Sequence, residues 1–326
     1  MSSPRFTLLG SVFGVGVHSR NALYDRGVLR ARRLRGPVVS VGNLSVGGSG
    51  KTPFVLLLGE LLKARGINLD ILSRGYGRQT RGVALVEPQG SARDFGDEPI
   101  LMARRLGVPV IVGEDRYEAG LFAEQKFGPQ LHILDDGFQH RALARDFDIV
   151  LITSDDSRDR LLPRGRLREP LNSLRRADAA ILVSGASADA FPLHGKFVWE
   201  ARRGIWPRSV PPRPVAFCGI ARPQNFFQQL RTARIQAVAE AVYCDHHAYT
   251  EKDVSELLEL CRAGEGGGFV TTEKDAINLG PLLAALQPLA VVPVRMKLLD
   301  APNVVDTLLR VVQERSAGHE KILLAQ

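Results

Sequence analysis

The sequence contains few cysteines and few aromatic residues, and each scarcity argues against a class of protein. Of its 326 residues three are cysteines, Cys218, Cys244 and Cys261, and no two have the Cys-x-x-Cys spacing of a zinc site. A disulfide framework is not implied, so we expect a reducing compartment. Aromatic residues make up 6% and do not interleave with the arginine runs, which disfavours a nucleic-acid-binding ATPase.

Long apolar runs are also missing. No stretch has 18 consecutive apolar residues, so we expect no segment that spans a bilayer. Residues 6–17 are apolar but too short to span one, and they lack a signal cleavage site. Residues 1–35 instead combine an apolar side with arginines, which predicts attachment to an anionic membrane surface; a core helix packed on a sheet is the alternative. The apolar side comprises Leu8, Leu9, Val12 and Phe13, and the arginines are Arg5, Arg20, Arg26, Arg30, Arg32, Arg33 and Arg35.

Lysine is scarce as well, with eight lysines against 35 arginines and a net charge of +8. Arginine suits planar, two-point recognition of phosphates and carboxylates. The charge therefore fits nucleic acid, an anionic membrane or a phosphorylated small substrate. The arginine usage of a GC-rich genome explains the ratio equally well.

Short apolar runs alternate with helical patterns from residue 36 onward. We expect strands over residues 37–43, 68–73, 108–112, 131–134, 148–153 and 178–183, with a helix over 51–65. This predicts an α/β fold in which a parallel sheet has helices on both faces. Four prolines in residues 204–214 interrupt the pattern. We therefore predict a first domain over residues 36–205 and a smaller α/β domain over residues 206–326, with strands at 215–220, 269–272 and 290–294.

A glycine-rich segment between the first expected strand and helix is typical of a P-loop, so the fold is expected to be P-loop NTPase-like. Backbone N–H groups of such a loop surround phosphate oxygens, Lys51 reaches the β- and γ-phosphates of ATP, and the Thr52 hydroxyl holds Mg²⁺. Ser45 stands where the pattern has glycine, and a plain strand-to-helix turn is the alternative. The nucleotide-binding residues are Ser45, Val46, Gly47, Gly48, Ser49, Gly50, Lys51 and Thr52.

Two acids, Asp135 and Asp136, follow an apolar strand, where a carboxylate can hold Mg²⁺ opposite Thr52; a helix N-cap is the alternative. A GTPase would carry Asn/Thr-Lys-x-Asp, but in the string at residues 272–275 the lysine is one place late. An ATPase of the partitioning class would have a lysine just before the Gly-Gly pair, where this chain has Val46. A nucleotide-switched regulator or metallochaperone is therefore disfavoured, which leaves a kinase or another transferase.

Residues 41–53 resemble the signature of the tetraacyldisaccharide 4'-kinase family, in which serine is tolerated at the first P-loop position. Matching stretches follow in family order at residues 73–78, 96–99, 135–140, 162–170, 245–247 and 271–275. The resemblance implies transfer of the γ-phosphate of ATP to the 4'-hydroxyl of a tetraacyl glucosamine disaccharide 1-phosphate in lipid A biosynthesis. It also implies a peripheral protein at the cytoplasmic face of the bacterial inner membrane. We expect no nucleic-acid partner and no obligate protein partner.

The resemblance further implies roles for single residues. Asp97 is the expected base, coupled to a histidine, and Arg168 contacts the transferring phosphate. We select His246 as that histidine because an acid can orient an imidazole that titrates near neutral pH; His247 is the rival, and a surface histidine the alternative. Surface ion pairs are the alternative for the arginines. The expected substrate-binding residues are Tyr76, Arg116, Gln139, His140 and Glu169.

Overall fold

The computed structural model describes the backbone of residues 4–324 and the side chains of residues 14–317. A large sheet runs in the order β13-β8-β7-β6-β1-β5-β2-β4-β3, with all strands parallel except β3 and β13. Its strands are β1 (Val38–Asn43), β2 (Leu69–Ser73), β3 (Ala84–Leu85), β4 (Val110–Val112), β5 (Leu131–Asp135), β6 (Phe147–Ile152), β7 (Ala179–Val183), β8 (Phe197–Ile205) and β13 (Val294–Leu298).

The central strands of this sheet are buried on both faces, which explains their continuous apolar composition. Alternate residues of β1 point to opposite faces, with Val39 and Val41 in one core cluster and Val38 in another. The first face packs against α2 (Lys51–Ala64), α4 (Asp97–Leu106) and α9 (Ala301–Leu324). The second packs against α5 (Arg116–Phe127) and the short helix η2 (Leu171–Arg176), while the short helix η1 (Ser154–Arg158) follows β6.

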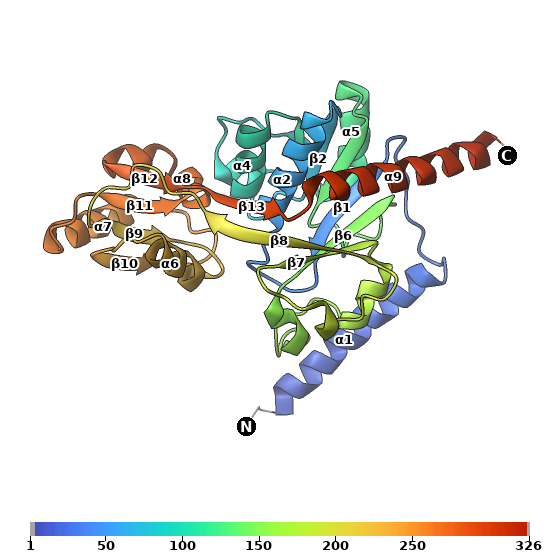
Figure 1. The fold of residues 1–326 in the computed structure, drawn as a ribbon, viewed down its shortest axis with the longest axis horizontal. Coiled ribbons are helices and arrows are strands. Elements are labelled where there is room, and N and C mark those ends of the chain that lie inside the picture. Colours follow the sequence, from blue (N-terminus) through green and yellow to red (C-terminus); the bar gives the residue numbers. More distant parts are fainter. Residues whose placement is uncertain (1–3, 325–326) are drawn as a thin grey trace.

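A smaller parallel sheet has the order β10-β9-β11-β12. Its strands are β9 (Val215–Cys218), β10 (Ala239–Val242), β11 (Phe269–Thr272) and β12 (Leu289–Val292). The helix α6 (Pro223–Thr232) packs on one face and α7 (Glu251–Ala263) on the other, while α8 (Glu273–Leu279) follows β11 directly. Figure 1 shows this domain standing apart from the large sheet at the end of β8 and β13. The predicted parallel sheet with helices on both faces and a second, smaller α/β domain is confirmed.

The end of the chain differs from the expected domain division. Residues 206–326 were expected to form the smaller domain, but its sheet ends at Val292 and β13 pairs antiparallel with β8 of the large sheet. Pro293, which has no N–H to donate, separates β12 from β13, so the expected strand over residues 290–294 becomes two. The helix α9 then buries Val304 and Leu308 in the core beside α2. The smaller domain is therefore an insertion between β8 and β13.

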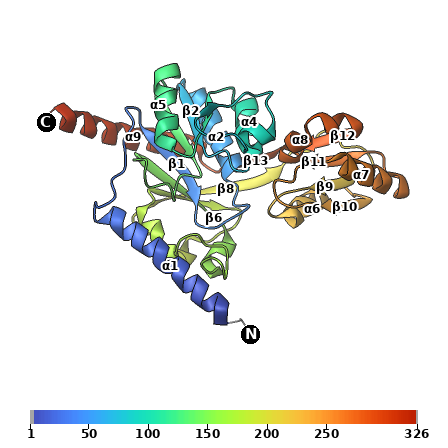
Figure 2. The same cartoon turned by 180° about the vertical axis from the view of Figure 1, so that it is seen from behind.

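The N-terminal helix α1 (Pro4–Asp25) lies along the large domain in both Figures 1 and 2. Arg141 donates to the Asn21 carbonyl (3.0 Å) and pairs with Asp25 (2.9 Å), and Arg175 pairs with the same carboxylate (2.7 Å). The C-terminal part of α1 is thus fixed by polar contacts. The side chains of Leu8, Leu9, Val12 and Phe13, and that of Arg5, lie outside the described residues.

Three arginines assigned to the membrane-facing run have other partners, and the first of them, Arg20, donates to the Gln139 carbonyl (3.1 Å). Arg32 pairs with Asp115 and with Glu118 (3.1 Å), and Arg33 pairs with the buried Asp146 (2.7 Å). These two residues therefore hold the linker after α1 on the large domain. Within residues 4–324, no helix is long and apolar enough to cross a membrane.

Candidate active site

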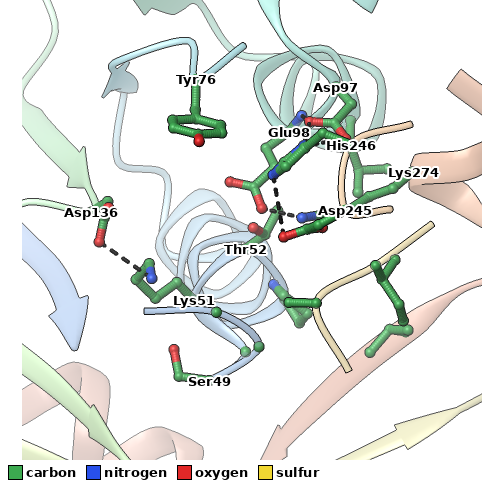
Figure 3. A pocket seen from close by; sticks show the side chains of 18 of the residues that line it. Ser49, Lys51, Thr52, Tyr76, Asp97, Glu98, Asp136, Asp245, His246 and Lys274 are labelled. Carbon is green, nitrogen blue, oxygen red and sulfur yellow. Dashed lines mark hydrogen bonds and ion pairs between the residues drawn. The ribbon is translucent and has the colours of Figure 1, made fainter. Parts of the chain in front are cut away.

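A cavity of about 610 Å³ lies where the carboxyl ends of β1, β2 and β5 face the smaller domain. Parallel sheets place ligand sites at this edge because loops and helix N-termini converge there. One wall is the P-loop and the N-terminus of α4, and the other comes from residues 220–222, 245–246 and 272–274. Figure 3 shows that side chains from both domains point into the same space.

The P-loop is held by the last residue of β1. The Asn43 amide donates to the Ser45 carbonyl (2.6 Å) and to the Ser49 hydroxyl (2.8 Å), and its oxygen accepts from Lys51 Nζ (3.0 Å). Glycine is required at Gly48 and Gly50, where φ is 62° and 90°. Ser45 has no positive φ, so its position does not need glycine, and its side chain is buried outside the cavity.

A group of acids lies beyond the P-loop lysine. Asp136 pairs with Lys51 (3.3 Å) and with Arg168 (2.8 Å). Burial opposes ionisation, but these two positive charges lower the pKa of Asp136 to about 2. Asp135 accepts from the Ser73 hydroxyl (2.9 Å). Burial and the nearby charges of Glu98 and Asp136 raise the pKa of Asp135 to about 7.

These residues fit a magnesium ion. Oxygen Oδ1 of Asp135 is buried without a hydrogen-bond partner, and the Thr52 hydroxyl lines the same cavity. Mg²⁺ takes one or two carboxylates and completes its shell with water and phosphate oxygens. Among the described residues no cluster of three His, Cys, Asp or Glu could hold a metal alone. The acids therefore suit an ion that arrives with a phosphate ligand.

Asp97 and His246 meet across the two domains (Figure 3). The His246 Nδ1 atom lies 3.0 and 2.9 Å from the two Asp97 oxygens, and the Asn278 amide donates to Asp97 (3.2 Å). The Tyr76 ring lies 5.3 Å from the imidazole. The hydrogen bond to Asp97 raises the pKa of His246. Burial disfavours the charged form of Asp97, yet His246 and Lys274 lower the pKa of its carboxyl.

His247 does not reach Asp97. Its Nε2 atom lies 3.1 Å from Asp253, and its ring stacks on Tyr243 at 4.8 Å between centroids. His246 itself adopts a φ of 57°, which turns its side chain toward the cavity. Of the two neighbouring histidines, the structure therefore brings only His246 to Asp97.

Lys274 also lines the cavity, although it is not among the predicted site residues. It forms an ion pair with Glu98, and next to it Glu273 pairs with Arg105 of α4 (2.9 Å). Burial opposes its charge, but Glu98 and Asp97 raise the pKa of Lys274. Residues 271–275, one of the stretches that match the family, contain this lysine and could have drawn attention to it. The stretch alone does not show that the side chain of Lys274 points into the cavity.

Other predicted residues also line the cavity, namely Tyr76 and Arg168. Gln139 does not line the cavity itself but contacts residues beside it. Its amide donates to the Asn43 carbonyl (2.9 Å), and its oxygen accepts from Arg168 (3.4 Å). Glu169 pairs with Arg176 (2.7 Å) and is buried.

Arg116 and His140 lie outside the cavity lining too. Arg116 is buried and donates to the Glu114 carbonyl (2.8 Å). Burial and the charge of Arg116 lower the pKa of His140 to about 4, and its Nε2 atom has no partner. The substrate-binding roles predicted for Arg116, Gln139, His140 and Glu169 therefore have no direct support in the cavity lining.

The family model of tetraacyldisaccharide-1-P 4'-kinase matches residues 4–313. The chain is 49% identical over 317 residues to the tetraacyldisaccharide 4'-kinase of Koribacter versatilis, covering 94% of this chain and 98% of that one. It is 36% identical over 315 residues to the Geobacter metallireducens enzyme, covering 90% and 93%.

The chain belongs to the tetraacyldisaccharide 4'-kinase family. The family predicted from the motifs is thereby confirmed. A crystal structure of LpxK from Aquifex aeolicus in complex with ATP matches with a TM-score of 0.78 and 35% identity, covering 94% of this chain and 98% of that one. The fold of a tetraacyldisaccharide 4'-kinase thus extends over both domains and the returning strand.

The Asp97–His246 pair predicts a pH-dependent contribution to stability. The contribution of His246, whose pKa is raised, is present below about pH 6.5 and is lost as pH rises through the folded-state pKa. That of Asp97, whose pKa is lowered, is present above about pH 3.9 and is lost as pH falls. Lys274 and Asp245 are the other charges facing His246.

We expect His246→Gln to lower the free energy of unfolding by about 1.5–3 kcal/mol at pH 5, because a charge-assisted hydrogen bond is lost, and by less at pH 9. Urea unfolding at both pH values measures this. His194→Gln, at an exposed position, is the control. An equal loss at the two pH values would show that the pair is not ionised.

Proposed function

We propose that this chain transfers the γ-phosphate of ATP to the 4'-hydroxyl of a tetraacyl glucosamine disaccharide 1-phosphate, a late step of lipid A biosynthesis. The observation that carries the proposal is a carboxylate–imidazole pair facing a P-loop in one cavity. Phosphoryl transfer needs positioned phosphates, neutralised charge and an acceptor for the hydroxyl proton. The cavity offers residues for all three.

The P-loop amides and Lys51 bind the β- and γ-phosphates. Lys51 is already oriented by Asn43 and Asp136, so little ordering is needed when the nucleotide enters. Thr52, Asp135 and Asp136 would hold Mg²⁺, which when bound neutralises charge on the phosphates. Asp135 fits the ion better than Asp136, because its free oxygen has no competing cation.

Asp97 takes the proton of the 4'-hydroxyl. The O–H bond breaks as the new O–P bond forms, the bond between the γ-phosphorus and the ADP oxygen breaks, and the proton remains on Asp97. His246 and Asn278 hold the carboxylate in place and keep it ionised. Arg168, anchored by Asp136, contacts the transferring phosphate.

The reaction is tested by transfer of labelled γ-phosphate to the tetraacyl disaccharide 1-phosphate. Lys51→Ala should lower kcat by about 10²-fold or more, because the cation at the γ-phosphate is removed. The exposed Lys252→Ala is the matched control. ATP hydrolysis of equal rate with and without the lipid, and no labelled lipid, would instead favour a nucleotide-switched regulator.

For Asp97→Asn we expect kcat to fall by about 10²–10⁴-fold, because a general base is lost, while KM for MgATP changes little. Combined with His246→Ala, the loss should be clearly less than the product of the two single losses, because the pair acts as a unit. Asp189→Asn, at an exposed position, is the control. A higher KM for MgATP with kcat preserved would make Asp97 a nucleotide ligand.

We also propose that the N-terminal region attaches the protein peripherally to the anionic cytoplasmic face of the inner membrane. The acyl chains keep the substrate in the bilayer, so the enzyme has to approach its surface. Val28 and Leu29 are 66% and 39% exposed and lie between Arg26 and Arg30, which are also exposed. Apolar side chains beside positive charge give the two-part attraction of peripheral proteins.

Changing Val28 and Leu29 to Ser together should weaken binding to phosphatidylglycerol vesicles by about tenfold or more, because apolar area no longer enters the interface. The wild type should bind less tightly in high salt but stay bound, since only the electrostatic part is screened. Vesicle sedimentation measures both. Val198→Ser, an exposed valine on β8, is the control. Unchanged sedimentation of the double variant would place the attachment elsewhere.

A further inference from the structure

Two arginines that are not among the predicted site residues lie over the tip of the P-loop. Arg203, on β8, donates from Nη1 to the Gly48 carbonyl (3.0 Å). Arg222 precedes α6 in the smaller domain, and its side chain packs so closely on the loop that a Cβ added at Gly48 would lie 2.9 Å from Arg222 Cδ. The preceding Ala221 contacts Gly47 in the same way. Both arginines line the cavity.

These guanidinium groups have more hydrogen-bond donors than partners. Arg222 pairs with Asp155 of η1 through Nη1 (3.1 Å), but its Nε and Nη2 atoms are buried without partners. The Nε atom of Arg203 is also unpartnered, and no carboxylate of the described part of the chain forms an ion pair with Arg203. Burial and the charge of Arg222 lower the pKa of Arg203.

Two neighbouring cations with unused donors require an anion, since a buried charge without a counter-charge is costly. The position of the donors without partners indicates that this anion is a phosphate group. They lie at Gly48, three residues before Lys51, where the P-loop amides turn toward phosphate oxygens. A guanidinium at that place offers two-point hydrogen bonds to a phosphate.

We propose that Arg203 and Arg222 bind the β- and γ-phosphates of the nucleotide from the side opposite Lys51, and that Arg222 thereby ties the position of the smaller domain to nucleotide binding. This inference rests on the proposed kinase reaction. During transfer, negative charge builds up on the oxygen that links the γ-phosphorus to ADP, and the two arginines neutralise it. No proton moves through them, because arginine stays protonated.

The test compares binding of ATP and AMP by calorimetry for Arg203→Gln and Arg222→Gln. Each variant should bind ATP about 10–100-fold more weakly, the loss typical of a charge-assisted contact, while the Kd for AMP changes less than about twofold. AMP lacks the two phosphates that the arginines contact. Each variant should also lower kcat for the lipid at least about tenfold.

Matched controls lie on the same elements. Arg202→Gln alters the exposed neighbour on β8, and Arg231→Gln an exposed arginine on α6, so both should bind ATP as the wild type does. Asp155→Asn removes the ion pair of Arg222 and should change ATP affinity less than about threefold. If Asp155→Asn weakens ATP binding as much as Arg222→Gln does, the arginine is a structural link to η1 and the proposal fails.

The proposal also fails if ATP affinity in the Arg203 and Arg222 variants equals that of the controls, or if AMP affinity falls equally. Should Arg203→Gln not fold, Arg203→Lys keeps the charge and removes the fork of donors, and its ATP affinity should still fall. Failure of the kinase reaction has a different result: the wild type then transfers no phosphate to the lipid, whatever the arginine variants bind.

Discussion

Ion pairs at the N-terminus of α4 join the two sheets at the place where the reaction is expected. Asp97 and Glu98 form the first turn of this helix, and their partners His246, Lys274 and Asn278 all belong to the smaller domain. The positive end of the helix dipole and the partner charges both stabilise the carboxylates. The proposed base is therefore held in this orientation only while the smaller domain lies against the N-terminus of α4.

The charges in the cavity are arranged in two groups, and in each group some side-chain atoms have no hydrogen-bond partner among the residues that the structure describes. On one side Asp135 has a carboxylate oxygen without a partner, close enough to Glu98 and Asp136 for their charges to raise its pKa. On the other side Arg203 and Arg222 have unused donors over the P-loop. A magnesium ion bound to nucleotide phosphates has the charges that both groups need. The cation matches the acids, and the phosphate oxygens match the arginines. One ligand thus satisfies both groups at once.

The parts of the fold that could be predicted from the sequence are those that depend on local pattern. The P-loop and most of the strands have their own turn residues and apolar periodicity, and Asp97 and His246 came from motif strings. The return of β13 and α9 to the large sheet was missed, because it depends on pairing between Val294 and Ile205, far apart in the chain. Likewise Arg203 lies in a strand without a motif, and only the fold brings Arg222 to Gly48. Glu169, which was predicted to bind substrate, pairs with Arg176, and this contact is not visible in the motif string.

The returning strand also determines how the smaller domain is able to move. The domain is connected to the large sheet through β8 and β13, which pair antiparallel from Val294–Ile205 to Leu298–Ala201. The same two strands carry Arg203, which holds the Gly48 carbonyl, and Met296, which contacts Gly50. Any displacement of the smaller domain has to bend this ribbon, and it shifts Arg222 and His246 together, because both are carried by the inserted segment. Contact with the nucleotide phosphates and orientation of the base are for this reason coupled through one pair of strands.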